Sequence, residues 1–250
     1  MLELYAQSFD CVEIDSTYYA IPKRSVFESM DRRTPPNFRF CVKVPGGVSH
    51  VPPDAQPSDE DVNAFADCLE PLGSAGKLGA VLAQFPHAFR PDAAAARRLT
   101  AMRHWWPQLP LVAEFRHRDW QHAEGIQLLR ELDIGWCNVD EPRFATLMQP
   151  GSEVTSAIGY VRFHGRNSAD WWKQGRSPGA RYDYLYSQEE LVEWLPRIAE
   201  IEARTRETYV FFNNHRLGKA AQNANQMGQM LGLRRREMKR PAGPRQEQLF

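Results

Sequence analysis

Seven short apolar runs, rich in β-branched and aromatic residues, recur along the 250-residue chain and alternate with amphipathic segments at helical spacing. Strands that alternate with helices favour a parallel sheet whose faces the helices cover. Seven such units at this length predict an α/β fold, a (β/α) TIM-type barrel with seven of the usual eight strands. The runs lie at residues 11–15, 38–44, 78–85, 109–116, 134–140, 158–164 and 208–214.

Helix starts support this alternation. Ser58 with Asp61, and Ser187 with Glu190, have the spacing of a capping box, and apolar residues at helical spacing follow each pair. A doubly wound open sheet is the competing fold. No GxGxxG or phosphate-binding loop follows the first strand, which disfavours that alternative without removing it. Further helical patterns lie at 92–106, 122–132 and 218–231.

The charge of the chain divides it into a body and a tail. Basic and acidic residues number 31 each, but residues 234–250 carry a net charge of +4 and the body a net −4. We therefore expect a single barrel domain over 1–233, followed by a basic tail whose Arg, Pro and Gln content predicts disorder. A basic tail indicates either a polyanionic partner or simply a soluble chain end.

The four cysteines lack metal-binding spacing, and the sequence contains no signal peptide and no apolar run of 18 residues. We expect a cytoplasmic protein without a membrane partner, whose cysteines pack in the core. The cysteines are Cys11, Cys41, Cys68 and Cys137.

Side chains within the apolar runs alternate between two faces. In residues 111–117, Glu114 and Arg116 share one face while Ala113 and Phe115 share the other. The same alternation recurs in five further runs, and the second face turns polar only towards the end of each run. In a barrel that face points inward, so we expect these residues at the C-terminal mouth, where barrel active sites lie. They are Glu13, Asp15, Lys43, Glu114, Arg116, Asp140, Arg162 and His164.

The carboxylates and the histidine of this set are candidate catalytic groups. Charged neighbours in a mouth of low dielectric shift pKa values, and carboxylates whose pKa values differ can divide the acid and base roles. The alternative is a structural network of ion pairs that fills the top of the barrel. The predicted catalytic residues are Glu114, Asp140, His164 and Glu13.

The cations of the set predict an anionic substrate. Arg116 and Arg162 can hold an oxyanion bidentately, Lys43 adds a point charge, and Asp15 contributes a negative charge at the rim. The alternative is that both arginines only clamp Glu114 and Asp140.

Residues in the following loops complete the predicted binding site. His117 follows the fourth run, Asn213 ends the seventh, where it can bind substrate or terminate the sheet, and Trp120 can stack on a ring or seal the loops. The chain has no HxH or HExxH spacing, and cations interleave with the carboxylates. We therefore predict no dedicated metal site, although a divalent metal remains an alternative.

Six motifs, in order, resemble those of the YecE-like proteins, domain-of-unknown-function family 72. They are "VEIDSTYY", "FRFCVKVPGGVSH", "LGAVLAQFPHAF", "VAEFRHRDW", "YVRFHGR" and "YVFFNN" followed by "AAQNANQM". The resemblance runs from about Leu4 to Leu231 and implies a TIM-type barrel, but no established reaction. Family members usually carry an earlier strand with a Gly-Thr-Ser-Gly-Trp-like motif and an Asn where this chain has Asp15. We expect a misplaced start codon to explain the missing strand, with a true seven-stranded barrel as the alternative.

The last five residues, "QEQLF", resemble the pentapeptide that binds the bacterial sliding clamp. Carried over by position, Gln246 is hydrogen-bonded while Leu249 and Phe250 fill an apolar pocket. Glu247 departs from the usual Leu, which should weaken the contact.

Three hypotheses on function follow. The first is an enzyme, for instance a hydrolase, that acts on an anionic, phosphate-containing substrate or on nucleic acid. The second is a non-catalytic nucleic-acid-associated protein tethered to the sliding clamp. The third is a carbohydrate-acting barrel that uses Glu13 or Asp15 with Glu114 as a carboxylate pair. The arginines and aromatics of loop 166–184 suit nucleic acid, although ordinary loops share that composition.

Overall fold

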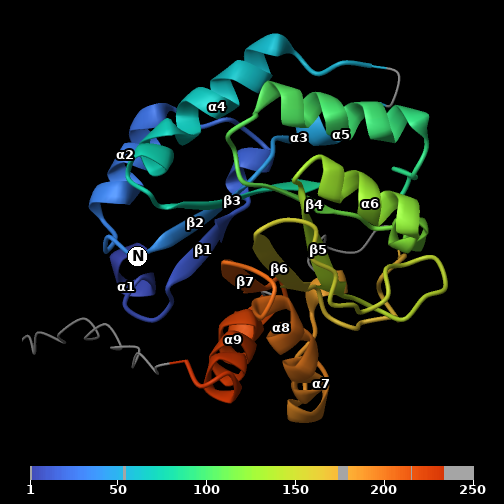
Figure 1. Cartoon of the computed structure of the whole chain (residues 1–250). Helices are drawn as coiled ribbons and strands as arrows, with labels where there is room; N and C mark the ends of the chain where they lie inside the picture. Colours follow the sequence, from blue (N-terminus) through green and yellow to red (C-terminus); the bar gives the residue numbers. More distant parts are fainter. Residues whose placement is uncertain (1, 53–54, 174–179, 215, 234–250) are drawn as a thin grey trace, which may run out of the picture.

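The computed structural model describes residues 2–52, 55–173, 180–214 and 216–233. Seven parallel strands form a nearly closed barrel surrounded by helices, so the predicted TIM-type barrel is confirmed (Figure 1). The strands follow one another in chain order, whereas a doubly wound sheet reverses its order at a switch point, so the open-sheet alternative is wrong. The strands are β1 (Cys11–Ile14), β2 (Arg39–Lys43), β3 (Leu78–Gln84), β4 (Leu111–Glu114), β5 (Gly135–Asp140), β6 (Ile158–Phe163) and β7 (Glu207–Phe212).

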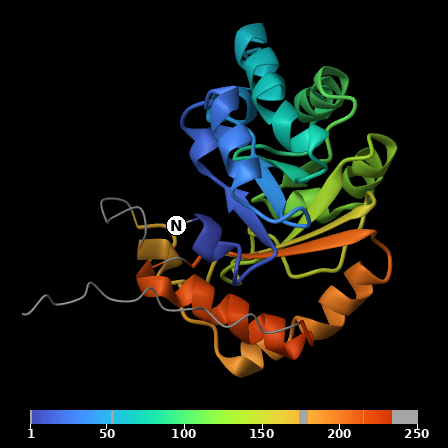
Figure 2. The same ribbon diagram turned by 90° about the vertical axis from the view of Figure 1, so that its left-hand side faces the viewer.

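Helices cover the outside of the barrel. Figure 1 shows α2, α4, α5 and α6 along one side and α7, α8 and α9 along the other. In Figure 2, α9 runs beside β7, which it contacts. Within the described ranges, no helix is long and apolar enough to cross a membrane. The α-helices are α1 (Leu2–Tyr5), α2 (Arg24–Arg32), α3 (Gly46–Ser49), α4 (Asp59–Ser74), α5 (Ala93–Trp105), α6 (Ala123–Glu131), α7 (Gln188–Val192), α8 (Leu195–Glu202) and α9 (Lys219–Met230). The short 3₁₀ helices are η1 (Ser16–Tyr18), η2 (Arg118–Gln121), η3 (Ala180–Tyr182) and η4 (Arg216–Gly218).

Both predicted helix starts occur at the expected residues. Ser187 and Glu190 form a full capping box at the start of α7, as predicted. Ser58 is the N-cap of α4, but its side chain accepts a hydrogen bond from the backbone N–H of Glu60 at 3.1 Å, and the predicted reciprocal contact with Asp61 is not part of this cap.

Strands β1 and β7 are the two edges of the sheet, and no backbone pairing joins them within the described residues. Side chains bridge this seam instead. The Tyr160 hydroxyl donates to Glu13 Oε2 at 2.6 Å, and Arg39 lies 3.4 Å from Glu207. The inside of the barrel is therefore continuous across the seam, although the backbone ladder is not.

The register between strands decides which side chains share the interior. Parallel pairing places Gln84 of β3 beside Glu114 of β4, and Val139 of β5 beside Arg162 of β6. Paired residues point to the same face of a sheet. The contacts among Gln84, Glu114 and Arg162 show that this face is the interior.

Trp120, predicted to bind substrate, lies instead in the core between strands and helices. Its ring stacks on Phe115 with centroids 4.0 Å apart, and its Nε1 donates to the carbonyl of Phe89 at 2.8 Å. Phe115 belongs to the outward face of the strand, so Trp120 is sealed beneath the loops and is fully buried. The structure therefore favours the alternative in which Trp120 seals the loops, because its buried ring is stacked on Phe115 and its Nε1 is bound to the carbonyl of Phe89.

We predict that Trp120→Ala lowers the free energy of unfolding by about 3–5 kcal/mol, the range for truncating a buried aromatic side chain. Trp120→Phe keeps an aromatic ring that can stack on Phe115 and loses the Nε1 hydrogen bond and part of the indole volume, so it should cost less. Urea unfolding of both variants measures the difference. A similar loss in the two variants would contradict the proposed role of the stack.

Candidate functional site

The centre of the candidate site is Arg162, which ends up inside the barrel without exposed surface. Its Nη1 donates to Glu114 Oε2 at 2.6 Å and to Gln84 Oε1 at 3.3 Å, and its Nη2 donates to Glu13 Oε1 at 2.5 Å. One guanidinium thus joins β6 to β4, β3 and β1. This arrangement resembles the clamping alternative more than an open anion site, although the partner of Arg162 is Glu13 rather than Asp140.

Arg116 forms a second layer nearer the opening. Its Nε lies 2.8 Å from Glu114 Oε1, and its Nη1 donates to Glu141 Oε2 at 3.1 Å. Glu141 also accepts a hydrogen bond from the backbone N–H of Met148. Glu141 is absent from the predicted site residues because it lies one residue beyond the apolar run 134–140. Period-two alternation puts Glu141 on the face of Cys137 and Val139, which was expected to point outward, so only the observed register shows that Glu141 points inward.

His164 is held in one tautomer by two neighbours. Its Nε2 lies 3.1 Å from Glu114 Oε1, and Asn213 Nδ2 lies 3.3 Å from its Nδ1. An ionised Glu114 only accepts hydrogen bonds, so the network assigns the proton to Nε2 and leaves Nδ1 as the acceptor for Asn213. His164 is therefore a neutral donor to Glu114.

The buried groups have pKa values that differ widely. Burial alone would raise the pKa of Glu114, but Arg116, Arg162 and His164 hold it well below its usual range. Burial and the positive charge of Arg116 lower the pKa of His164 to about 3. Burial raises the pKa of Glu141 to about 7, against the opposing attraction of Arg116. Near neutral pH the site thus combines an ionised carboxylate, a neutral imidazole and a carboxyl group that exchanges its proton.

Exposure increases from the floor of the site to its opening. Glu114, Arg162 and His164 are fully buried, whereas Arg116 keeps 11% of its side chain exposed, Lys43 13% and Asp15 46%. Lys43 lies over the Tyr18 ring at 4.7 Å, and burial lowers its pKa while Asp15 opposes this. The open layer therefore consists of Asp15, Lys43 and Arg116.

Aromatic side chains from three loops form a rim beside this opening. The exposed Trp172 contacts His87, at 5.4 Å between centroids, and Phe144, at 6.0 Å. His87 in turn contacts His117 at 4.7 Å. His117 is buried, and its Nδ1 accepts the backbone N–H of Asp119, so the structure places it in the rim and not in the charged cluster.

Asp140 lies on the outer face of β5, away from the cluster that it was predicted to join. Trp194 Nε1 donates to it at 2.6 Å, the Tyr186 hydroxyl at 2.8 Å, and Arg166 binds both of its oxygens. Its predicted position in the mouth is wrong, because strand pairing aligns it with Phe163, which packs outward against Trp194. Cys137 points inward instead, with its Sγ 3.8 Å from Glu114 Oε2.

The other predicted residues fall into two groups. The structure brings together the following: Glu13, Asp15, Lys43, Glu114, Arg116, Arg162, His164 and Asn213. Their catalytic and binding roles stay predictions. Gln246, Leu249 and Phe250 lie outside the described residues, so the clamp-binding prediction remains an expectation.

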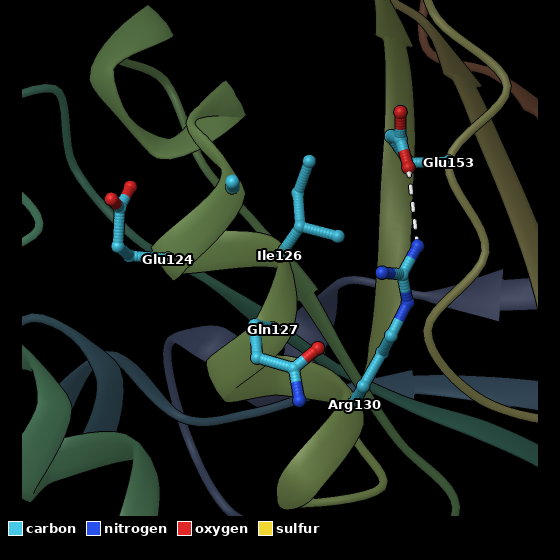
Figure 3. Close-up of a pocket in the computed structure, with 6 residues that line it drawn as sticks. Glu124, Ile126, Gln127, Arg130 and Glu153 are labelled. Atoms are coloured by element: carbon cyan, nitrogen blue, oxygen red, sulfur yellow. Dashed lines mark ion pairs between the residues drawn. The ribbon is translucent and has the colours of Figure 1, made fainter.

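A surface pocket outside the barrel is separate from this cluster. It lies along α6 and is lined by Ala123, Glu124, Ile126, Gln127, Arg130 and Glu153 (Figure 3). Arg130 and Glu153 form an ion pair of 3.8 Å across it. None of the predicted site residues lines this pocket. Within the described part of the chain, no three or more His, Cys, Asp or Glu side chains are grouped to hold a metal ion.

Fold and site together define the class of protein: a TIM-type α/β barrel with a buried network of carboxylates and cations at its C-terminal end. The chain belongs to the family described as "Protein of unknown function DUF72", whose model matches residues 1–248. The resemblance to YecE-like proteins is thereby confirmed.

Curated relatives and solved structures agree with this assignment. The chain is 30% identical to UPF0759 protein YunF of Bacillus subtilis (strain 168), over 100% of this chain and 91% of that protein. It is 37% identical to UPF0759 protein YecE of Escherichia coli (strain K12), over 44% of this chain and 37% of that protein. The crystal structure of a DUF72 family protein from Enterococcus faecalis V583 matches with a TM-score of 0.88 at 30% identity, covering 97% of this chain and 92% of that one. That of a DUF72 family protein from Thermotoga maritima MSB8 matches with a TM-score of 0.79 at 39% identity, covering 90% and 85%.

We predict that Glu141→Gln changes the pH dependence of stability. The pKa of Glu141 is raised on folding, so its stabilising effect is complete below its unfolded value of 4.5 and is lost as pH rises through about 7. Glutamine does not ionise, so the Glu141→Gln variant does not lose this stability as pH rises. The free energy of unfolding of Glu141→Gln relative to the parent chain should therefore increase by about 2–3 kcal/mol between pH 5 and pH 8.

Urea unfolding at both pH values measures this difference. The low pKa of His164 also makes stability depend on pH, but this contribution cancels in the difference because both chains contain His164. A constant difference between the two chains would show that the pKa of Glu141 is not raised.

Proposed function

We propose that this protein is an enzyme that binds a small anionic, phosphate-containing substrate at the C-terminal mouth and transfers a proton through Glu141. The observation that carries the proposal is the contact between Arg116, which reaches the open layer of the site, and Glu141, which lies behind it without exposed surface. It places a permanent cation beside a carboxyl group that changes its charge near neutral pH. This combination can bind an anion and supply or remove a proton within one site.

The division between floor and opening supports this assignment. Arg162 has both Nη atoms occupied by protein acceptors and has no exposed surface, so it positions Glu114 and Glu13. Arg116 reaches the opening, and Lys43 adds positive potential. Carrying buried charge costs several kcal/mol per ion, and a barrel core can be filled by apolar side chains instead. We infer that the charges serve binding and catalysis rather than stability.

The chemical sequence follows from the groups at the opening. The anionic group binds to Arg116, which strengthens the preference of Glu141 for its protonated form because a second negative charge is then close by. In the proton-transfer step, the O–H bond of protonated Glu141 breaks and a new O–H bond forms on a negatively charged oxygen of the bound substrate. The negative charge passes to the Glu141 carboxylate, which Arg116 stabilises. His164 remains neutral and, with Asn213, keeps Glu114 in place.

Sulfate tests the binding step because, unlike phosphate, it keeps the same charge between pH 6 and pH 8.5. Bound sulfate favours protonated Glu141, so we expect its affinity in isothermal titration calorimetry to fall as pH rises through about 7. Glu141→Gln should bind sulfate with an affinity that changes little over this range. An identical pH dependence in both chains would exclude Glu141 as the coupled group.

Arg116→Gln should lower sulfate affinity by at least about tenfold, the effect of losing one charge-assisted bond. Arg103→Gln is the matched control, since among the described residues the hydrogen bonds of Arg103 go to backbone carbonyls away from the cluster, including those of Leu132 and Asp133. Circular dichroism confirms that both variants are folded. Equal sulfate affinity in Arg116→Gln and the parent chain would overturn the proposed anion site.

A further inference from the structure

The carboxylate of Asp15 does not cap the helix that follows it. Asp15 is the N-cap residue of η1, a position where an aspartate usually accepts a backbone N–H, but its side chain makes no such bond. One of its oxygens, Oδ1, is enclosed, and it has no hydrogen-bond partner within the described residues. The turn around Asp15 is fixed instead by Thr17, whose hydroxyl donates to the carbonyl of Lys43 at 2.6 Å.

Two cations face this oxygen at a distance too long for a hydrogen bond. Lys43 Nζ and Arg162 Nη2 each lie 3.7 Å from Asp15 Oδ1, beyond the usual range of about 2.7–3.2 Å. Arg162 Nε is also enclosed and without a protein partner within the described residues, on a side chain that has no exposed surface. A buried donor and a buried acceptor therefore remain unsatisfied on neighbouring groups, which is costly unless a ligand pairs with them.

A hydroxyl group complements this arrangement. It can donate to Asp15 Oδ1 and accept from Lys43 or Arg162 at the same time. A phosphate oxygen only accepts, and would meet the negative charge of Asp15. We propose that Asp15, Lys43 and Arg162 form a hydroxyl-binding subsite, so that the substrate is a hydroxylated anion of the polyol phosphate or sugar phosphate class.

The subsite adjoins the proposed anion site. His50 lies close enough to Lys43 and Arg116 for both cations, after burial, to lower its pKa. The ring of Tyr18 lies under Lys43 and beside His50, with centroids 5.0 Å apart, and provides an apolar wall for the carbon chain of such a substrate. One molecule can thus place its anionic group at Arg116 and a hydroxyl at Asp15. This inference rests on the proposed function, whose anion site it extends.

The experiment compares xylitol 5-phosphate with n-pentyl phosphate, which has the same carbon chain and phosphate but no hydroxyls. Isothermal titration calorimetry should show at least about tenfold tighter binding of xylitol 5-phosphate to the parent chain. In Asp15→Ala that preference should disappear, while the affinity for pentyl phosphate is kept or rises. Equal binding of the two compounds by the parent chain would overturn the subsite and leave the proposed function intact.

Asp92→Ala is the matched control, because Asp92 is an N-cap aspartate that does accept its backbone N–H, from Ala95 at 2.8 Å. It should lower the melting temperature without changing the ratio of the two affinities, whereas Asp15→Ala loses no cap bond. If neither phosphate compound binds, the proposed function fails. Thermal melting with free xylitol then tests the hydroxyl-binding subsite by itself. A higher melting temperature of the parent chain, but not of Asp15→Ala, supports the subsite. If xylitol leaves the melting curves of both chains unchanged, water alone occupies the position and the subsite is overturned.

Discussion

The ion pairs of Arg162 with Glu114 and Glu13 are the contacts on which the rest of the site depends. They join strands β6, β4 and β1 inside the barrel, where the cation and Glu114 have no exposed surface. Removing either carboxylate would leave the buried Arg162 with one carboxylate partner in place of two, and breaking a buried ion pair costs about 3–5 kcal/mol in other proteins. Because β1 and β7 share no backbone ladder within the described residues, the contact of Arg162 with Glu13 also ties the two sides of the seam together.

The charges and pKa values at the opening of the site depend on these buried ion pairs. Glu114 is shared by Arg162, Arg116 and His164, so it stays ionised and fixes the donor tautomer of His164. Arg116 must then divide its charge between Glu114 and Glu141. Burial of Glu141 is only partly compensated by that shared cation, and its pKa rises to about 7. The buried network can therefore have both a structural and a functional role. The ion pairs of Glu114 occupy part of the charge of Arg116, and this leaves the pKa of Glu141 raised.

The same reasoning separates two kinds of polar cluster in this fold. Asp140 is surrounded by Trp194, Tyr186 and Arg166, and these donors satisfy it fully on the helix side of β5. Asp15 has no such set of donors, although it lies at the end of a strand as Asp140 does. A buried polar group with hydrogen-bond partners adds to the stability of a fold, whereas one without partners requires an explanation, and for Asp15 we propose a ligand hydroxyl.

The sequence by itself determined the strands, their order round a barrel and most of the inward residues. Period-two alternation identifies residues that share a face, and in β1, β4 and β6 only one face carries charge, as Glu13, Glu114 and Arg162 illustrate. In β5 the polar residues Asn138 and Asp140 also share one face, but that face points outward, and alternation alone does not say which face points inward. The tertiary structure decided this through register, since Val139 pairs with Arg162 inside and Asp140 with Phe163 outside. It also decided that Trp120 stacks on Phe115 and that Glu141 reaches Arg116, because such contacts depend on neighbours far apart in the chain.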